Sequence, residues 1–118
     1  RRRLGGFHRL ARVKRGDLYY VNPPSFVGKV RPAVIVQSNV FNRNPPSVTL
    51  CLLTSTLVDS RLRVTLQPSK GNGLEKPSQV MIDKVMTLPL DKLSNRIGAV
   101  SADELDQIGA SLRAWMDL

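Results

Sequence analysis

Short apolar runs separated by turn-forming residues fill the chain between positions 16 and 100. Runs of four to seven residues bounded by Pro, Gly and Asn predict β-strands. The expected strands are 18–21, 31–37, 48–54, 61–66, 80–85 and 97–100. Segment 48–54 is apolar at almost every position, which predicts a central strand covered on both faces, whereas 61–66 alternates and predicts a peripheral one.

The end of the chain has the pattern of an amphipathic helix. Ser101 is followed three positions later by Glu104, the pairing of a capping box. An apolar stripe at helical spacing follows, formed by Leu105, Ile108, Leu112 and Trp115 or Met116. We expect this stripe to pack on the sheet, with outward polar positions at Asp103, Asp106, Gln107 and Arg113. With one helical turn at 89–93, this predicts an α+β fold, a small barrel or half-barrel with a C-terminal helix.

Length and cysteine usage limit the class of protein. A chain of 118 residues suits one domain. The single cysteine, Cys51, forms neither an internal disulfide nor a structural zinc site, which fits a reducing compartment, so we expect a cytoplasmic protein. No apolar run approaches the roughly 20 residues of a membrane-spanning helix, so we expect no membrane partner.

The positive charge is concentrated at the start of the chain. The formal charge is +9, and residues 1–15 hold seven of the 18 cations and no acid. We therefore expect a disordered basic tail at 1–12 and a folded domain at 13–118. Such a tail either attracts phosphate groups or is an extension ahead of a true start near Val13.

Most catalytic constellations are missing from the expected folded domain. The one histidine, His8, lies in the tail, so the expected folded domain contains none. This rules out Ser-His-Asp and Cys-His arrangements in that domain. The sequence contains neither a phosphate-binding P-loop nor a paired-carboxylate metal motif, so we expect no cofactor and no metal site. Cys51 lies inside an apolar strand, where a thiol acts as a small hydrophobe.

Polar residues at strand ends remain as candidates. Arg31 opens the second strand, Thr54 closes the third, and Asp83 lies in the fifth. RNA supplies its own nucleophile, the 2′-hydroxyl, so an arginine fork, a hydroxyl donor and a carboxylate suffice to cleave it. Spacing alone leaves open the alternative that these side chains only satisfy backbone groups at the rim of the sheet.

Several segments together carry a family resemblance. They are Lys14-Arg15-Gly16-Asp17-Leu18-Tyr19-Tyr20-Val21, Arg31-Pro32-Ala33-Val34-Ile35-Val36-Gln37, Leu52-Leu53-Thr54-Ser55, Gly73-Leu74-Glu75-Lys76-Pro77-Ser78-Gln79-Val80 and Asp83-Lys84-Val85-Met86-Thr87-Leu88. In this order, over about residues 13–118, the sequence resembles the MazF/PemK (Kid) toxins of bacterial toxin–antitoxin modules.

The resemblance implies both a fold and a function. The fold would be a small SH3-like (CcdB/Kid-type) β-barrel with a C-terminal helix, assembled as a homodimer. The function would be metal-independent, sequence-selective cleavage of single-stranded RNA, often mRNA, which inhibits translation and is neutralised by a cognate antitoxin. Such antitoxins are acidic disordered segments that a positive groove attracts.

The resemblance also implies site residues. By position, Arg31 matches the family's catalytic arginine, Thr54 its catalytic threonine, and Asp83 an acid of the Kid branch. We further expect contacts with RNA from Ser25, Lys29, Ser55 and Lys84. The loop 22–30 is shorter than its family counterpart and lacks its Glu-Gln, and Met81 stands where the Kid branch has an arginine. The sequence therefore assigns neither general base nor general acid.

Two other functions are alternatives. One is a CcdB-like toxin that binds DNA gyrase; its C-terminal Trp-Gly-Ile is absent, because Trp115 is followed by Met-Asp-Leu. The other is a non-catalytic barrel that binds RNA or an antitoxin peptide without turnover. The matches at Arg31 and Thr54 favour the ribonuclease, since a gyrase-binding protein has no use for a phosphate-binding rim.

Overall fold

The computed structural model describes residues 12–23 and 29–118. Their main elements are β1 (Asp17–Val21), β2 (Arg31–Ile35), β3 (Ser47–Thr54), β4 (Arg63–Leu66), β5 (Ser78–Pro89), β6 (Leu93–Ala99) and α2 (Ala102–Met116). Two 3₁₀ turns, η2 (Asn39–Phe41) and η3 (Leu90–Lys92), precede β3 and β6. The expected tail lies outside the described residues except for Arg12, and so does His8.

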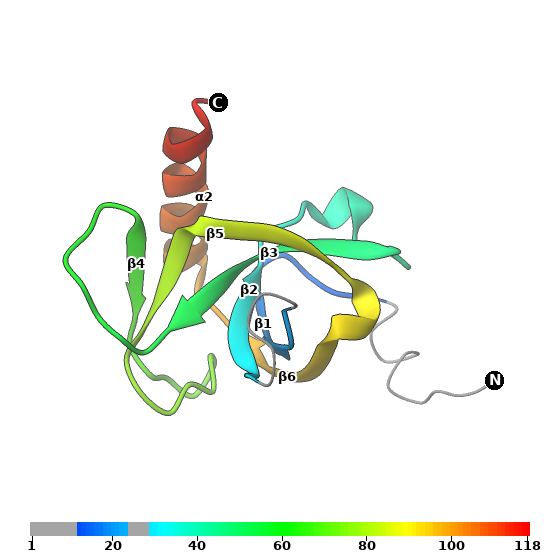
Figure 1. Cartoon of the computed structure of the whole chain (residues 1–118), viewed down its shortest axis with the longest axis horizontal. Helices are drawn as coiled ribbons and strands as arrows, with labels where there is room; N and C mark the ends of the chain where they lie inside the picture. The colour runs from blue at the N-terminus through cyan, green and yellow to red at the C-terminus, as the bar shows by residue number, and fades with distance from the viewer. Residues whose placement is uncertain (1–11, 24–28) are drawn as a thin grey trace.

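The strands form one antiparallel sheet with the order β4-β5-β3-β2-β1-β6. The predicted α+β class with a C-terminal helix is confirmed, and the sheet curls strongly around its core (Figure 1). It is open rather than a closed barrel, because within the described residues no ladder joins the edge strands β4 and β6. The predictions that the third strand is central and the fourth peripheral are also confirmed.

Strands β5 and β6 are longer than their patterns predict. The sequence predicts this strand only as far as Val85, yet β5 continues to Pro89 because its second half pairs with the first half of β3. On this stretch Leu88 is buried, and the hydroxyl groups of Thr49 and Thr87 share a hydrogen bond of 2.8 Å. Cross-strand pairing thus carries β5 beyond the segment that the local pattern predicts.

Buried side chains lie on both faces of the sheet. Leu50 and Leu52 of β3 belong to one core cluster, and Cys51 and Leu53, which alternate with them, belong to the other. The second cluster also includes Ile108 of α2, which packs against β5 and β4. Burial on both faces explains why β3 is almost continuously apolar.

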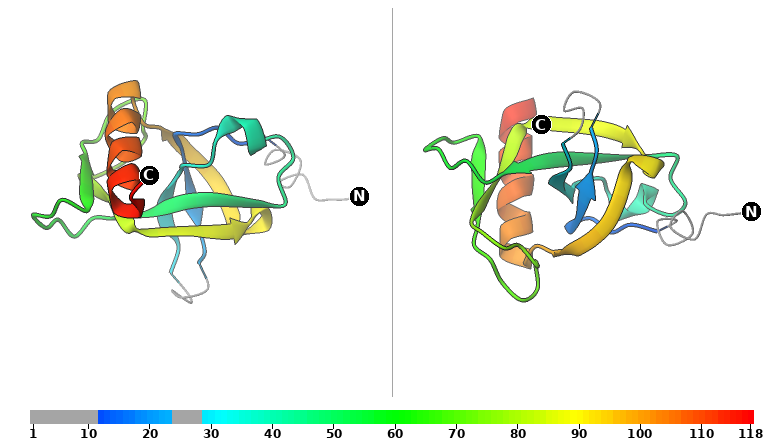
Figure 2. Two further views of the ribbon diagram at one scale, coloured as in Figure 1. Left: turned by 90° about the horizontal axis from the view of Figure 1, so that it is seen from above. Right: turned by 60° about the horizontal axis from the view of Figure 1, so that its bottom comes forward.

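The helix begins as its sequence predicts. The Ser101 N–H donates to Glu104 Oε1 at 2.8 Å and the Glu104 N–H donates to Ser101 Oγ at 3.1 Å, which completes the capping box. The expectation that Trp115 or Met116 would continue the buried stripe is wrong, since their side chains are 48% and 46% exposed. The last turn of α2 passes beyond β5, so no sheet surface remains to cover it (Figures 1 and 2). Of the helices described, none is long and apolar enough to cross a membrane.

Candidate active site

A polar groove of about 390 Å³ lies where β1 and β3 end and β2 begins. Four of the residues expected to act on RNA line it: Lys29, Arg31, Thr54 and Ser55. The other lining residues are Tyr20, Val30, Pro32, Leu53, Thr56, Leu74, Glu75, Lys76 and Ser78. The structure therefore gathers into one groove residues that are far apart in the chain.

Strand pairing brings Arg31 and Thr54 together. The β2–β3 ladder pairs Ala33 with Leu52, Val34 with Cys51 and so on. The ladder ends at the Ala33–Leu52 pair, and Arg31 and Thr54 each lie two residues beyond that pair at the same end of the ladder. Each residue is at one end of its strand, so both side chains lie at the rim rather than in the core.

The hydroxyl group of Thr54 is available to donate a hydrogen bond. Its oxygen accepts a hydrogen bond from the Thr56 backbone N–H at 3.1 Å. A hydroxyl that accepts in this way still has its own O–H to donate. In the part of the chain that the structure describes, no acceptor for that O–H is found, and the side chain borders the groove.

Gln79 supports the strand end that carries Thr54. It is buried and lies opposite Thr54 in the β3–β5 ladder. Its Oε1 accepts from the Val58 N–H at 3.0 Å and from Arg63 Nη1 at 3.2 Å, and its Nε2 donates to Val58 O at 3.0 Å and Thr65 Oγ1 at 3.1 Å. The segment after Thr54 is thereby tied to β5 and β4, which fixes one wall of the groove.

The opposite wall is a loop locked against β6. Asn72 is buried; its Oδ1 accepts from the backbone N–H groups of Ser69 and Leu74, both at 3.0 Å. Gly73 has φ +66°, and a Cβ there would lie 2.4 Å from the backbone oxygen of Ile97. Only glycine fits this left-handed, closely packed position, so the residues after it are presented at a defined place.

Glu75 is the functional candidate that the sequence analysis missed. It is exposed on that loop, two residues after Gly73, and is the carboxylate among the described residues that line the groove. Tyr20 and Lys76 were missed as well. The sequence did contain signals for these three residues. Glu75 and Lys76 belong to one of the segments that carry the family resemblance. Tyr20 follows the buried Tyr19 in a strand, so its side chain lies on the opposite face.

Asp83 and Lys84 lie elsewhere. Both are exposed on β5, and neither is among the residues that line the groove in this protomer. Asp83 acts electrostatically on Cys51, near the middle of β3 rather than at its end. Ser25, also expected to contact RNA, is outside the described residues.

The charges of the groove favour an anionic ligand. The cations Lys29, Arg31 and Lys76 line it against the single carboxylate of Glu75. An arginine fork matches two oxygens of a phosphate group, and a hydroxyl donor fits a third. In the described ranges, His, Cys, Asp and Glu form no group of three or more that could hold a metal ion.

Cys51 is a structural residue. It is fully buried, and burial raises the pKa of its thiol from 9.0 to about 12, with a smaller raising effect from Asp83 opposed by Arg15. A thiol with so high a pKa is not a nucleophile near neutral pH. Its expected role as a small apolar side chain agrees with its place in the core cluster under α2.

The protein is a small α+β domain with an open antiparallel sheet and a capped C-terminal helix. The cationic groove at the ends of its strands suits a phosphate group. A family model described as "PemK-like, MazF-like toxin of type II toxin-antitoxin system" matches residues 14–116. The chain belongs to this family.

Individual relatives agree with this assignment. The chain is 31% identical over 108 residues to the probable endoribonuclease MazF of Mycolicibacterium smegmatis, covering 90% of this chain and 98% of that protein. It is 24% identical to the endoribonuclease EndoA of Bacillus subtilis, covering 90% and 96%. A solved mycobacterial endoribonuclease in complex with its cognate antitoxin superimposes with a TM-score of 0.78 at 26% identity, covering 90% of this chain and 96% of that one.

Proposed function

We propose that this protein is a toxin that cleaves single-stranded RNA without a metal ion and is neutralised by a cognate antitoxin. The observation that supports this most directly is the convergence of Arg31 and Thr54, from opposed strand ends, on one cationic groove. The relatives named above are endoribonucleases, and one was solved with its antitoxin.

The reaction that suits these residues is an internal transfer. The 2′-oxygen of the RNA bonds to phosphorus, the bond from phosphorus to the 5′-oxygen breaks, and the products are a 2′,3′-cyclic phosphate and a 5′-hydroxyl. Arg31 binds two phosphoryl oxygens of the pentavalent transition state, and the Thr54 hydroxyl donates to one of them. Because the RNA provides the nucleophile, the protein has only to position the phosphate and move two protons.

Glu75 is proposed as the group that takes the 2′-hydroxyl proton. A guanidinium is a poor base at neutral pH, whereas a carboxylate is ionised and able to accept. The leaving 5′-oxygen takes up a proton, for which the ammonium groups of Lys29 and Lys76 in the same groove are donors. Asp83, which does not line the groove, is assigned to substrate contact outside the reacting centre.

Exposed apolar side chains point to a protein partner. Apolar side chains are exposed in the loop after β3 and at the end of α2, namely Leu57, Val58, Trp115 and Met116. We assign this surface to a homodimer interface, since exposed apolar patches of this kind mark protein contacts. The apolar segment 48–53 is buried within the chain except at Thr49, so it is not assigned to the interface. RNA sequence selectivity is assigned to the loop 22–30, of which Lys29 and Val30 line the groove.

Incubation of the purified protein with single-stranded RNA in excess EDTA tests the proposal. Fragments ending in a cyclic phosphate should appear, and Arg31→Ala should abolish them. Arg113→Ala, which removes an exposed arginine on α2, is the matched control and should cut normally. RNA that is bound but not cut by the wild-type protein would favour a non-catalytic binding role, and intact, unbound RNA would refute the assignment.

A further inference from the structure

A second cationic surface lies at the opposite end of the β1–β2 hairpin from the groove. A hollow of about 340 Å³ is formed there by Arg12, Val13, Lys14, Asn39, Asn42 and Arg43. The groove borders the end of β1, whereas the residues of this hollow include Arg12, Val13 and Lys14, which precede the first residue of β1, Asp17. Nothing in the proposed cleavage reaction uses these residues.

Two arginines face each other across the hollow. Arg12 and Arg43 form an isolated antiparallel β-bridge and are both exposed. Like charges placed directly opposite in a β-pair destabilise it. An anionic group between the two guanidinium groups would turn this repulsion into attraction, so the pairing points to an anionic ligand.

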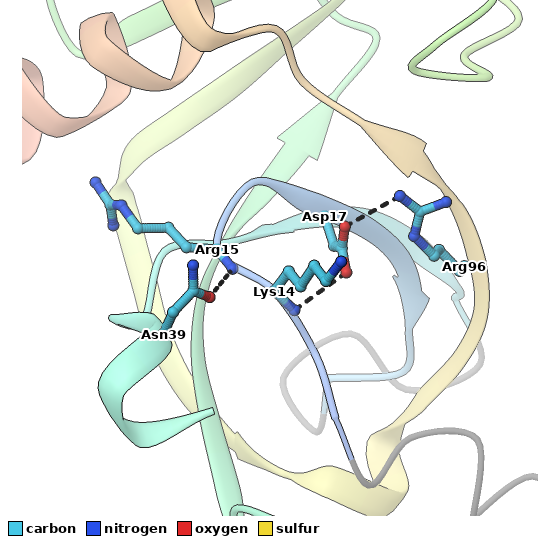
Figure 3. Close-up of polar contacts among 5 residues, drawn as sticks. All are labelled: Lys14, Arg15, Asp17, Asn39 and Arg96. Carbon is cyan, nitrogen blue, oxygen red and sulfur yellow. Dashed lines mark hydrogen bonds and ion pairs between the residues drawn. The ribbon is translucent and has the colours of Figure 1, made fainter. Parts of the chain in front are cut away.

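The nearby carboxylate is already engaged. Asp17 is buried; its Oδ1 accepts from Arg96 Nη2 at 3.1 Å and its Oδ2 from the Lys14 backbone N–H at 3.1 Å (Figure 3). The Asp17–Arg96 contact is the one ion pair among the described residues, so Arg12, Lys14 and Arg43 have none. The hollow therefore presents three cations with no acid among its lining residues.

Side-chain amides hold the walls of the hollow in place. Asn42 is only 2% exposed, and its Nδ2 donates to Gln37 O and Asn39 Oδ1, both at 3.0 Å. Asn39 Oδ1 also accepts from the Arg15 backbone N–H at 2.7 Å (Figure 3), and the Val13 N–H donates to Asn42 O at 3.4 Å. The backbone segment with Arg43 is thus tied to the segment with Arg12, which keeps the two arginines paired.

An exposed aromatic residue lies close to the cations in the chain. Phe41 ends η2, two residues before Arg43, and its side chain is 69% exposed. A large exposed ring costs hydration free energy unless a partner covers it. Single-stranded nucleic acids bind surfaces that combine phosphate-binding cations with aromatic rings on which a base stacks.

We propose that this surface is an exosite for single-stranded RNA: Arg12, Lys14 and Arg43 bind phosphate groups and Phe41 stacks on a base, outside the scissile site. The inference rests on the proposed ribonuclease function for the identity of the nucleic acid. An acidic peptide would satisfy the cations equally well, but the flat exposed ring close to them in the chain favours a nucleobase. Long RNA should therefore be held at two places, and short RNA only at the groove.

The test uses the double variant Arg12→Gln/Arg43→Gln, which removes two cations of the hollow. The control is the double variant Lys70→Gln/Arg113→Gln, which removes two exposed cations elsewhere. Binding of a fluorescent 20-nucleotide RNA is measured in full-length protein at several salt concentrations. Removing two phosphate contacts should reduce the slope of log K against log salt by about 1.4. The control should keep the wild-type slope, and Phe41→Ala should weaken binding roughly tenfold with the slope unchanged.

Cleavage and stability measurements separate the outcomes. The wild type should cut a long RNA more efficiently than a short one with the same site, and the double variant should cut the two equally. The unfolding midpoint of the variant should match or exceed that of the wild type because a repulsion is removed. Equal salt-dependence slopes for the double variant and the control would overturn the exosite. So would a double variant that binds polyglutamate more weakly than the wild type does but binds RNA equally well. If the wild type binds RNA with the expected slopes yet cuts none, the exosite stands and the ribonuclease proposal fails.

Discussion

Arg31 begins β2 and Thr54 ends β3, and both line the same groove. The sheet thus creates a site at its rim from residues 23 positions apart in the chain. Gln79, the cross-strand neighbour of Thr54 on β5, is buried and anchors the adjoining loop through hydrogen bonds to Val58. The placement of the reactive groups is therefore part of the backbone pairing itself, and the following consequences can be measured.

Two substitutions at Thr54 test the contribution of its hydroxyl group separately from that of the side-chain shape. Thr54→Val keeps the branched side chain but removes the donor, and we expect kcat to fall about 10²-fold, as for loss of one transition-state donor. Thr54→Ser retains the hydroxyl and should keep most of the activity. Single-turnover cleavage of RNA measures both, and equal rates for the two variants would contradict a role for the hydroxyl.

Glu75→Gln should lower kcat about 10²-fold, because the amide cannot take the proton of the 2′-hydroxyl. Asp106→Asn is the matched control and should cut normally, since Asp106 is an exposed carboxylate on α2 outside the groove. A larger loss of rate in Asp83→Asn than in Glu75→Gln would reverse the roles assigned to Asp83 and Glu75.

Gln79→Ala should destabilise the fold. The substitution removes the four hydrogen bonds of a buried side chain, and we expect a loss of about 1–3 kcal/mol in the free energy of unfolding. Gln107→Ala, on the exposed face of α2, should change it by less than about 0.5 kcal/mol. Urea denaturation compares the two, and equal midpoints would show that the Gln79 network adds no stability.

Gly73→Ala should be strongly destabilising. Its φ of +66° costs an L-residue roughly 1–2 kcal/mol, and the added Cβ would lie 2.4 Å from Ile97 O. Gly71→Ala is the control in the same loop, because its Cβ would meet nothing closer than Ser69 Oγ at 4.0 Å. Thermal unfolding of both variants checks this, and the loop geometry would be wrong if Gly71→Ala were the less stable.

Cys51 should resist alkylation by iodoacetamide in the folded protein and react on denaturation. The pKa of its thiol is raised from 9.0 to about 12, so the folded state holds a proton that the unfolded state loses between these pH values. Stability should therefore fall as pH rises from 9 to 12, by about 1.4 kcal/mol per pH unit for this group. Burial also raises the pKa of Tyr19, which adds to the loss above pH 10.

Cys51→Ala serves as the reference for that measurement. It should retain only the part of the alkaline destabilisation that comes from Tyr19 and other groups. Urea midpoints at several pH values in this range provide the comparison. Identical pH dependence in the wild type and Cys51→Ala would show that the thiol titrates equally in both states.

Local patterns in the sequence determined the elements that depend on near neighbours. The capping box fixed the start of α2, the continuous apolar run identified β3 as central, and alternation identified β4 as peripheral, because each is set by contacts within a few residues or by burial of one face. Arg31 and Thr54 were candidates from their positions at strand ends, the resemblance to a toxin family supported them, and both line the groove.

The tertiary structure decided which polar residues meet. Pairing of β2 with β3 placed Arg31 and Thr54 at one groove, and the locked loop with Gly73 brought Glu75 there, whereas Asp83 does not line it. The exposure of Trp115 likewise depends on where the sheet ends beneath α2, which helical spacing does not encode. Side-chain convergence depends on the register between distant strands, and that register is set by the packing of the whole core.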